Sequence, residues 1–485
     1  MYRRIFPTPK ALQRRWLATL GALTLALPLA TAHAAKPVID TPSVQDLRAN
    51  YDTIHQHTLD NGLTVLIVED HSVPIVTIEM AVRNGAFAES EDINGLSHLY
   101  EHMFFKANDV YPSQEAYMQR QQELGMDWNG TTSTERVNYF FTLPAELLDE
   151  GLAFMNAAIR TPHFIPEELE REKEVVLGEY DRAQANPYWD LWRGTAELLW
   201  YEHPWRKNPI GSREAIKNAT VEHMQSMQDD FYVPNNSLLV LAGDISKQEG
   251  IALAQKHFDD WKQGGDPFQK RPVPEHPPLQ KDVARSIGQA IGTTTIQMSW
   301  QGPTTQNHIE DTYAADILGY ALSQVTSGLQ QRLVESGIAL YASLGYHTQR
   351  HGGPIQFSVT VAPGNEQAAI DAMNQELKRM LQEDYLTDEL IQTSKTVLSV
   401  DDLSLQQSSL QLAHTLSYWW CSADLDYYLS YIENLHKVTR TDIQRFVQRW
   451  IQNQPRAVIL IGPEDIAAQW PESRLLDAIS KEVTP

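Results

Sequence analysis

The chain has 485 residues, with 39 lysines and arginines against 62 aspartates and glutamates, so its formal net charge is −23 at pH 7. This acidic balance argues against nucleic acid as a partner, because proteins that bind phosphate backbones carry basic patches. Cys421 is the single cysteine, so no intrachain disulfide can form, and the length suffices for two or more hydrophobic cores.

Residues 1–34 have the pattern of a secretory signal peptide. Five basic residues come first, an apolar run from Trp16 to Ala30 follows, and small residues end at Ala34. The alternative is a retained membrane anchor, but Pro28 interrupts the run and we expect cleavage after Ala34. Cleavage would leave 34 basic and 62 acidic residues, a formal charge of −28. We therefore expect a protein of the Gram-negative periplasm, or a secreted one, with no membrane anchor after cleavage.

The next segment, residues 45–262, is predicted to be an α+β domain. Asn61-Gly62 between two apolar runs predicts a hairpin, and residues 76–82 alternate between apolar and other side chains as a half-buried strand does. An apolar stripe that includes Leu148 and Leu152 predicts a helix. We expect an antiparallel sheet with helices packed on one face.

A helix within this domain carries a metal-binding pattern. Residues 95–105 contain no internal glycine or proline, and His98 and His102 are four residues apart, so both imidazoles project from one helical face. Two imidazoles placed in this way can chelate Zn²⁺, and Glu101 lies beside them as a candidate general base. The order His-x-x-Glu-His is a known catalytic motif. The alternative is two surface or capping histidines on an amphipathic helix.

A second helix, predicted to begin at Pro166, supplies candidate carboxylate ligands. Glu172 and Glu179 share a face with Val175 and Val176. A buried carboxylate needs a partner, and a metal ion is one such partner. The other glutamates of this helix fit a solvated charge run: Glu167, Glu168, Glu170 and Glu174.

The second half of the chain repeats a pattern of the first. A stretch rich in proline and glycine predicts a linker at residues 263–283. A helix-then-strand unit that ends at Gly243 recurs 219 residues later, ending at Gly462. We therefore expect residues 284–485 to form a C-terminal homologous domain without a metal site.

These motifs resemble those of the pitrilysin/insulinase family of zinc metallopeptidases, which includes mitochondrial processing peptidase. Residues 95–106 are similar to the helix that carries the inverted zinc motif, and residues 172–179 are similar to the segment Glu-Lys-x-Val-Val-x-x-Glu. The likeness runs over nearly the whole mature chain. It implies an α+β fold of two homologous domains that form a clamshell.

The resemblance also assigns roles. It implies one Zn²⁺ per chain with His98, His102 and Glu179 as ligands, Glu101 as the general base and Glu172 as a supporting acidic residue. In such a site the metal lowers the pKa of water and polarises the peptide carbonyl, while the base accepts the proton.

Residues 127–133 resemble the edge strand on which these peptidases lay an extended substrate. By this resemblance Asn129, Gly130 and Thr131 bind the peptide, with Asn129 orienting a substrate carbonyl or the attacking water. The alternative role of Asn129 is that of a turn residue.

One position departs from the family. Its members take an arginine and a tyrosine, seven residues apart, from the later domain to stabilise the oxyanion. Tyr341 matches this catalytic tyrosine, but the position seven residues earlier is Val334, and Arg332 is two residues away. Some bacterial members divide the site between two chains, one with the zinc motif and one with the arginine and tyrosine.

The sequence therefore predicts a zinc endopeptidase that hydrolyses peptides or unfolded polypeptides as the zinc-bearing subunit of a heterodimer. A homologous partner chain would supply the arginine and tyrosine. The alternative is a non-catalytic assembly or scaffold subunit, like the related core proteins of the respiratory bc complex. An intact set of candidate ligands argues against that alternative, because a scaffold does not need one.

Overall fold

The structure is a computed structural model, and it describes residues 49–202 and 206–480. The expected signal peptide, residues 1–34, lies outside this range. Within the described residues, no helix combines the length and apolar character needed to cross a membrane.

The first half of the chain forms a sheet of six strands in the order β1-β2-β6-β3-β5-β4. The bounds of these strands are β1 Ile54–Thr58, β2 Thr64–Glu69, β3 Ile75–Val82, β4 Asp127–Thr132, β5 Val137–Pro144 and β6 Ser237–Gly243.

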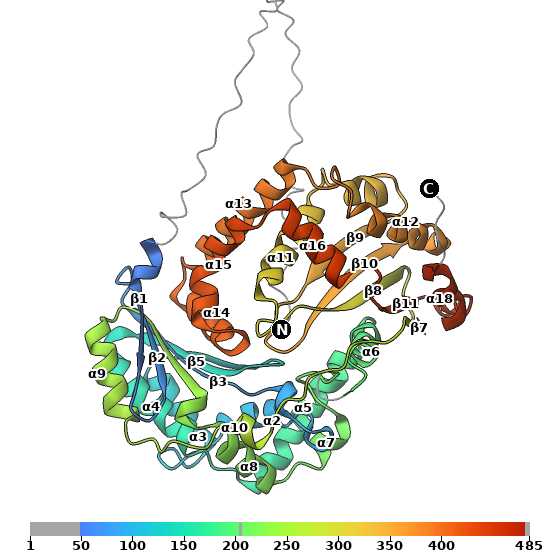
Figure 1. The fold of residues 1–485 in the computed structure, drawn as a ribbon. Coiled ribbons are helices and arrows are strands. Elements are labelled where there is room, and N and C mark those ends of the chain that lie inside the picture. Colours follow the sequence, from blue (N-terminus) through green and yellow to red (C-terminus); the bar gives the residue numbers. More distant parts are fainter. Residues whose placement is uncertain (1–48, 203–205, 481–485) are drawn as a thin grey trace, which may run out of the picture. The chain divides into compact units, whose positions relative to one another are not determined.

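Helices of the first half other than α6 build the layer that buries one face of this sheet, and α2, α4 and α9 contact it directly (Figure 1). The bounds of the helices of the first half are α2 Leu96–Phe104, α3 Gln114–Glu123, α4 Leu148–Arg160, α5 Pro166–Gln184, α6 Trp189–Leu199, α7 Arg213–Lys217, α8 Val221–Phe231 and α9 Lys247–Phe258. The predicted linker, 263–283, contains the short helix α10 (Pro267–Lys270) and ends on the first residue of strand β7.

The second half forms a five-stranded sheet in the order β7-β11-β8-β10-β9. The bounds of these strands are β7 Val283–Gly288, β8 Thr294–Gly302, β9 Tyr341–Tyr346, β10 Gly353–Val361 and β11 Ala457–Gly462. Its helices are α11 Ile309–Ser323, α12 Glu366–Arg379, α13 Asp388–Leu405, α14 Ser409–Ser422, α15 Leu425–Lys437, α16 Arg440–Trp450, α17 Glu464–Ala467 and α18 Glu472–Ser480.

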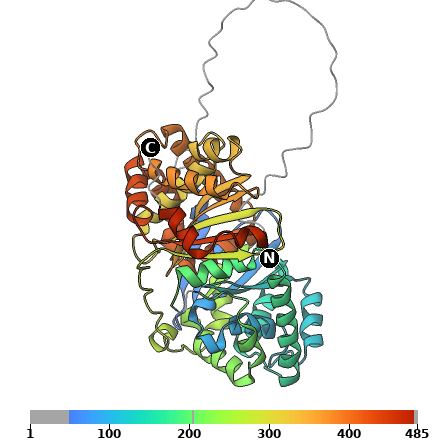
Figure 2. The same ribbon diagram turned by 90° about the vertical axis from the view of Figure 1, so that its right-hand side faces the viewer.

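The second sheet repeats the strand order β2-β6-β3-β5-β4 of the first, and the parallel pairs have the same register, which confirms an α+β chain of two similar domains. Thr64 of β2 pairs with Leu238 of β6, and Val283 of β7 pairs with Ala457 of β11. Each residue of the second pair lies 219 positions after its counterpart in the first pair, which is the shift predicted from the sequence repeat. Most elements of the first half lie below those of the second half in both views of the ribbon (Figures 1 and 2).

Each sheet departs from the purely antiparallel arrangement that the sequence predicted. The pairs β2–β6 and β7–β11 are parallel, while the other pairs are antiparallel. The physical reason is the long connection between the two strands of each parallel pair, which contains helices and strands of the same domain. A parallel pair requires such a crossover.

The other face of each sheet is covered by a helix from the other half of the chain. Helix α14 of the second half packs on β3 and β6, opposite α4 (Figure 1), and α6 of the first half packs on β7 and β11. The expectation of helices on one face was therefore incomplete. The apolar run of β6 is typical of a strand buried on both faces. The cluster between α14 and the first sheet includes Leu66, Val240, Leu412, Leu416 and Trp420.

Shortening Leu416 should show that α14 contributes to the stability of the first domain. Leu416 is fully buried in this cluster, so Leu416→Ala should lower the free energy of unfolding by about 2–5 kcal/mol. Val400→Ala on the exposed side of α13 is the matched control and should change it by no more than about 0.5 kcal/mol. Urea unfolding measures both, and equal small effects would contradict the packing described here.

Candidate metal centre

The zinc-motif helix α2 begins at a buried cap. Gly95 precedes the helix with a φ of 104°, a conformation that favours glycine, and it has no side chain to cap the first turn. The carboxylate of Glu89 does so instead, accepting hydrogen bonds from the backbone N–H of Gly95 (2.8 Å) and Ser97 (2.7 Å). Burial raises the pKa of Glu89 in spite of these bonds. The sequence analysis did not identify Glu89, although an acidic side chain near a helix N-terminus is a usable signal.

Two imidazoles and one carboxylate converge where α2 meets α5. Nε2 of His98 lies 3.4 Å from Oε2 of Glu179, and Nε2 of His102 lies 3.7 Å from the same oxygen. Ligand atoms of the three residues all lie within 4.8 Å of one another. Two imidazoles with one carboxylate form a donor set typical of catalytic zinc, which leaves a further position for water or substrate. Within the described residues, no other group of three or more such side chains converges in this way.

The ring of His102 is oriented by a buried carboxylate. Nδ1 of His102 lies 3.0 Å from Oε2 of Glu172, and Nζ of Lys106 lies 2.6 Å from Oε1 of Glu172. Burial alone would raise the pKa of Glu172, but these two partners hold it below its ordinary value. Glu172 therefore fixes the ring through Nδ1 and leaves Nε2 directed at Glu179, the usual arrangement around metal-binding histidines.

The protonation of the two histidines differs. Burial, together with the neighbouring His102, lowers the pKa of His98 to about 4, so this imidazole is neutral. Its Nδ1 is buried and has no hydrogen-bond partner in the described part of the chain. Burial would lower the pKa of His102 as well, but Glu172 and Glu179 raise it to about 9. A histidine ligand must be neutral, so a cation that binds His102 displaces a proton.

Glu101, the predicted general base, lies in an environment that suits a group able to accept a proton. Its side chain is buried, and Oγ1 of Thr132 donates a hydrogen bond to Oε2 at 2.6 Å. Burial raises the pKa of Glu101 to about 7, although Thr132 lowers it, and such a value suits proton transfer near neutral pH. Thr132 was not identified from the sequence, because nothing local to residues 127–133 shows which side chain reaches α2.

Strand β4 closes the site on one side. It lies at the edge of the first sheet and pairs with β5. A Cβ added to Gly130 would lie 3.0 Å from both Cγ and Oε1 of Glu101, so the strand backbone passes directly over the base. The ring of Trp128 lies 4.7 Å from that of Phe105 on the same side.

The remaining predicted substrate contacts point the other way. Alternation along β4 places Asn129 and Thr131 on the face opposite Gly130 and Thr132. Oδ1 of Asn129 accepts a hydrogen bond from the N–H of Gly130 at 2.9 Å, and Oγ1 of Thr131 donates one to Oδ1 of Asn138. The side chains of Asn129 and Thr131 are therefore directed away from Glu101.

The predicted oxyanion residues lie in the second half. Tyr341 is the first residue of the edge strand β9, and 56% of it is exposed. Val334 packs against the core of the second domain. Arg332 forms a two-pronged ion pair with Glu376, at 2.5 Å from Nε and 2.8 Å from Nη2, and is therefore committed to that carboxylate.

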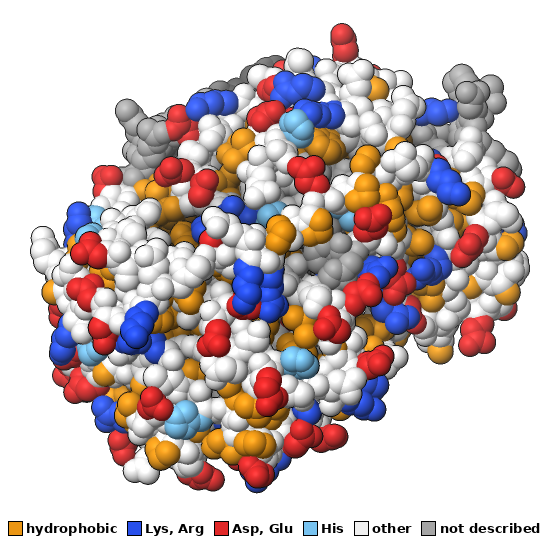
Figure 3. All heavy atoms as spheres, turned by 60° about the horizontal axis from the view of Figure 1, so that its bottom comes forward, with side chains coloured by type: hydrophobic (Ala, Val, Ile, Leu, Met, Phe, Trp, Pro, Cys, Tyr) orange, Lys and Arg blue, Asp and Glu red, His pale blue; other side chains and the backbone are white. Residues whose placement is uncertain are grey.

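Charge is mixed over the surface that Figure 3 draws. Aspartate and glutamate side chains lie among lysine and arginine side chains there, and no patch of one sign dominates that face. The acidic balance of the chain is consistent with solubility rather than with a single acidic binding surface on this side.

Two family models match the chain. The model described as insulinase, peptidase family M16, matches residues 64–211. The model described as the peptidase M16 inactive domain matches residues 218–398. The chain belongs to the insulinase family of peptidases.

Several curated relatives of this M16 chain are named zinc proteases. It is 28% identical to an uncharacterized zinc protease of Rickettsia felis, over 42% of this chain and 50% of that protein. It is 21% identical to the zinc protease PqqE of Helicobacter pylori, over 84% of this chain and 92% of that protein. These names agree with the zinc-type donor set of α2 and α5.

Solved structures show the same fold. The first half of the periplasmic protease PqqL from Escherichia coli has a TM-score of 0.74 and 19% identity, and the match covers 89% of this chain and 98% of that one. Only 51% of the complete PqqL chain is covered. This M16 chain therefore spans about half of PqqL, as it spans about half of the Rickettsia felis relative.

The described part of the second domain holds no comparable donor set. Among the described residues, the group formed by His98, His102 and Glu179 is the single one in which three or more possible metal-binding side chains converge, and all three belong to the first domain.

Replacing Glu179 tests the ligand set. Glu179→Gln should sharply reduce retention of a divalent metal, because a neutral amide is a poorer ligand than a carboxylate. Glu174→Gln, on the exposed side of the same helix, is the control and should keep the wild-type metal content. Elemental analysis of both purified variants measures the effect. Unchanged metal in Glu179→Gln would remove this residue from the site.

Proposed function

We propose that this chain is a zinc endopeptidase that hydrolyses peptides or unfolded polypeptides. The observation that carries the proposal is the convergence of His98, His102 and Glu179 beside a buried Glu101. One zinc ion per chain fits this donor set. The alternative function is that of a scaffold subunit, which would not need four such side chains placed close together.

Each residue has a distinct task in this proposal. Zinc, when bound, supplies a Lewis acid that polarises a peptide carbonyl and acidifies water. Glu101 accepts the proton of the attacking water, and Thr132 holds its carboxylate in place. Glu172 orients His102, and the open edge of β4 offers main-chain hydrogen bonds to an extended peptide. Binding through the backbone favours substrates without fixed structure.

The proposal includes a homologous partner chain that completes the site. Val334 stands where the family expects an arginine, and Arg332 is bound to Glu376. A second chain would bring the arginine and tyrosine. The relation to PqqL supports this division, because this chain corresponds to only one half of that protease.

We also propose that the chain works in the periplasm or outside the cell. The sequence of residues 1–34 carries an export pattern, and PqqL is described as a periplasmic protease.

The role of Glu101 can be separated from metal binding. Glu101→Gln should retain zinc, because Glu101 is not one of the three ligands, and should abolish peptide hydrolysis because the amide cannot accept the proton. Hydrolysis of an unstructured fluorogenic peptide is measured with zinc content determined on the same samples, and His98→Ala is included as a variant that should lose both. Substantial turnover by Glu101→Gln would rule out this mechanism.

A site divided between two chains should make the isolated chain a weak peptidase. The absence of an oxyanion donor typically costs about a hundred- to a thousandfold in rate, so the isolated zinc-loaded chain should cleave poorly. A homologous chain with the arginine and tyrosine, obtained by pull-down from the native periplasm, should restore the rate. Full activity of the isolated chain, with contamination by a partner excluded, would contradict the heterodimer.

A further inference from the structure

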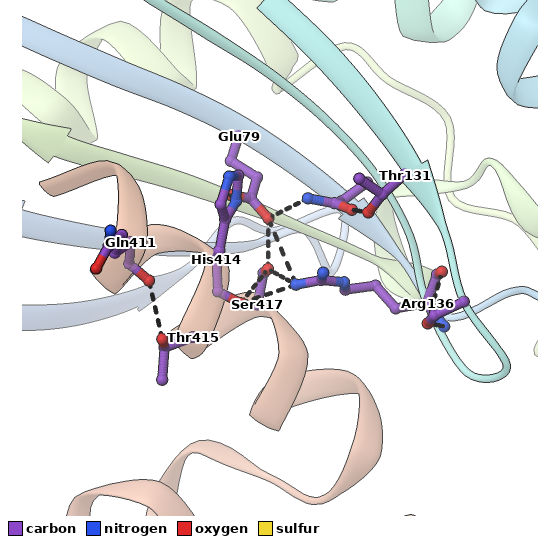
Figure 4. Close-up of polar contacts among 9 residues, drawn as sticks. Glu79, Thr131, Arg136, Gln411, His414, Thr415 and Ser417 are labelled. Carbon is purple, nitrogen blue, oxygen red and sulfur yellow. Dashed lines mark hydrogen bonds and ion pairs between the residues drawn. The ribbon is translucent and has the colours of Figure 1, made fainter. Parts of the chain in front are cut away.

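A buried polar cluster lies between helix α14 and the first sheet (Figure 4). Helix α2 and the metal centre lie on the other face of this sheet. The centre of the cluster is Glu79 of the central strand β3, whose side chain is completely buried. Oε2 of Glu79 lies 2.5 Å from Nδ1 of His414, and Oε1 accepts a hydrogen bond from Oγ of Ser417. Burial alone would raise the pKa of Glu79, but His414 and Arg136 hold it below its ordinary value. The carboxylate is therefore charged and needs these partners.

The cluster also ties α14 to strand β5. Nη1 of Arg136 donates hydrogen bonds to the carbonyl oxygen of His414 at 2.8 Å and to Oγ of Ser417 at 2.7 Å. The turn between β4 and β5 has a second connection to the other half, because the carboxylate of Glu135 accepts hydrogen bonds from the N–H groups of Arg350 and His351. The β4–β5 hairpin is thus held by the second domain at two places.

From Glu79 the hydrogen bonds continue to the edge strand. Nδ2 of Asn138 on β5 donates to Oε1 of Glu79 at 2.8 Å, and Oγ1 of Thr131 on β4 donates to Oδ1 of Asn138. The next residue, Thr132, points to the other face and holds Glu101. A displacement of β4 would therefore move both the substrate-binding edge and the hydrogen bond to the general base.

We propose that Glu79, Asn138 and Thr131 are positioning residues. Their hydrogen bonds connect α14 to β4 and thereby fix the position of Thr132 beside Glu101. None of the three touches the metal ligands. The chain Ser417–Glu79–Asn138–Thr131 links the second domain to the site by side chains on one sheet face. The effect on catalysis rests on the proposed peptidase function, whereas the effect on β4 does not.

The test compares pairs of variants that remove one hydroxyl each. Thr131→Val preserves a β-branched shape and removes the link to Asn138, while Thr77→Val removes a hydroxyl that contacts Thr142 at 2.9 Å on the same sheet face. Ser417→Ala removes the α14 contact to Glu79. Thr415→Ala is its control, because the Thr415 hydroxyl bonds to Gln411 within α14 (Figure 4).

Hydrogen exchange of the zinc-loaded chain without substrate provides the first readout. Amides of residues 127–132 should exchange about tenfold faster in Thr131→Val and Ser417→Ala, and within about twofold of wild type in both controls. Thr131→Ser keeps the hydroxyl and should restore wild-type exchange. Equal exchange of β4 in the test variants and their controls would overturn the proposal.

Peptide hydrolysis, measured with the partner chain if it is required, provides the second readout. Thr131→Val and Ser417→Ala should lower kcat about tenfold at unchanged zinc content, with a smaller change in KM. The reason is that a displaced general base slows the chemical step that follows substrate binding. Ser417 is buried on α14, so its effect cannot arise from substrate contact. Faster exchange without a change in kcat would overturn the link to Glu101. Absence of hydrolysis by the wild type in every form would instead count against the peptidase function.

Discussion

The metal centre depends on one buried carboxylate, that of Glu172. A charged group inside a protein is tolerated only with partners, and Glu172 has two, Lys106 and Nδ1 of His102. Both partners come from the segment that carries the zinc motif, so the ion pair locks α5 against α2. Glu179, seven residues further along α5, is thereby brought to the Nε2 atoms of both histidines.

The sequence predicted much of this site and only part of its surroundings. Helical spacing was enough to place His98 and His102 on one face, and the resemblance identified Glu179. The contacts of Glu89 and Thr132 were missed because they join segments that are distant in the chain, and local periodicity carries no information about which side chains meet. The alternation of residues 76–82 correctly predicted strand β3, but the covering of its second face by α14 depends on tertiary packing.

The two domains share one fold but differ in the side chains that they carry. The strand order β2-β6-β3-β5-β4 of the first sheet recurs as β7-β11-β8-β10-β9 in the second. The converging metal-type side chains of the described residues belong to the first domain alone. The second domain acts on the first through α14, whose polar side covers Glu79 and whose apolar side covers β3 and β6. The metal-type side chains and the helix that covers the other face of their sheet thus come from two different copies of one module.

Anomalous diffraction at the zinc absorption edge, from crystals of the zinc-loaded chain, tests the central claim most directly. The account predicts one peak, bonded to Nε2 of His98, Nε2 of His102 and a carboxylate oxygen of Glu179, with nitrogen and oxygen ligands at about 2.0–2.2 Å. A peak at other residues, or none between α2 and α5, would contradict it.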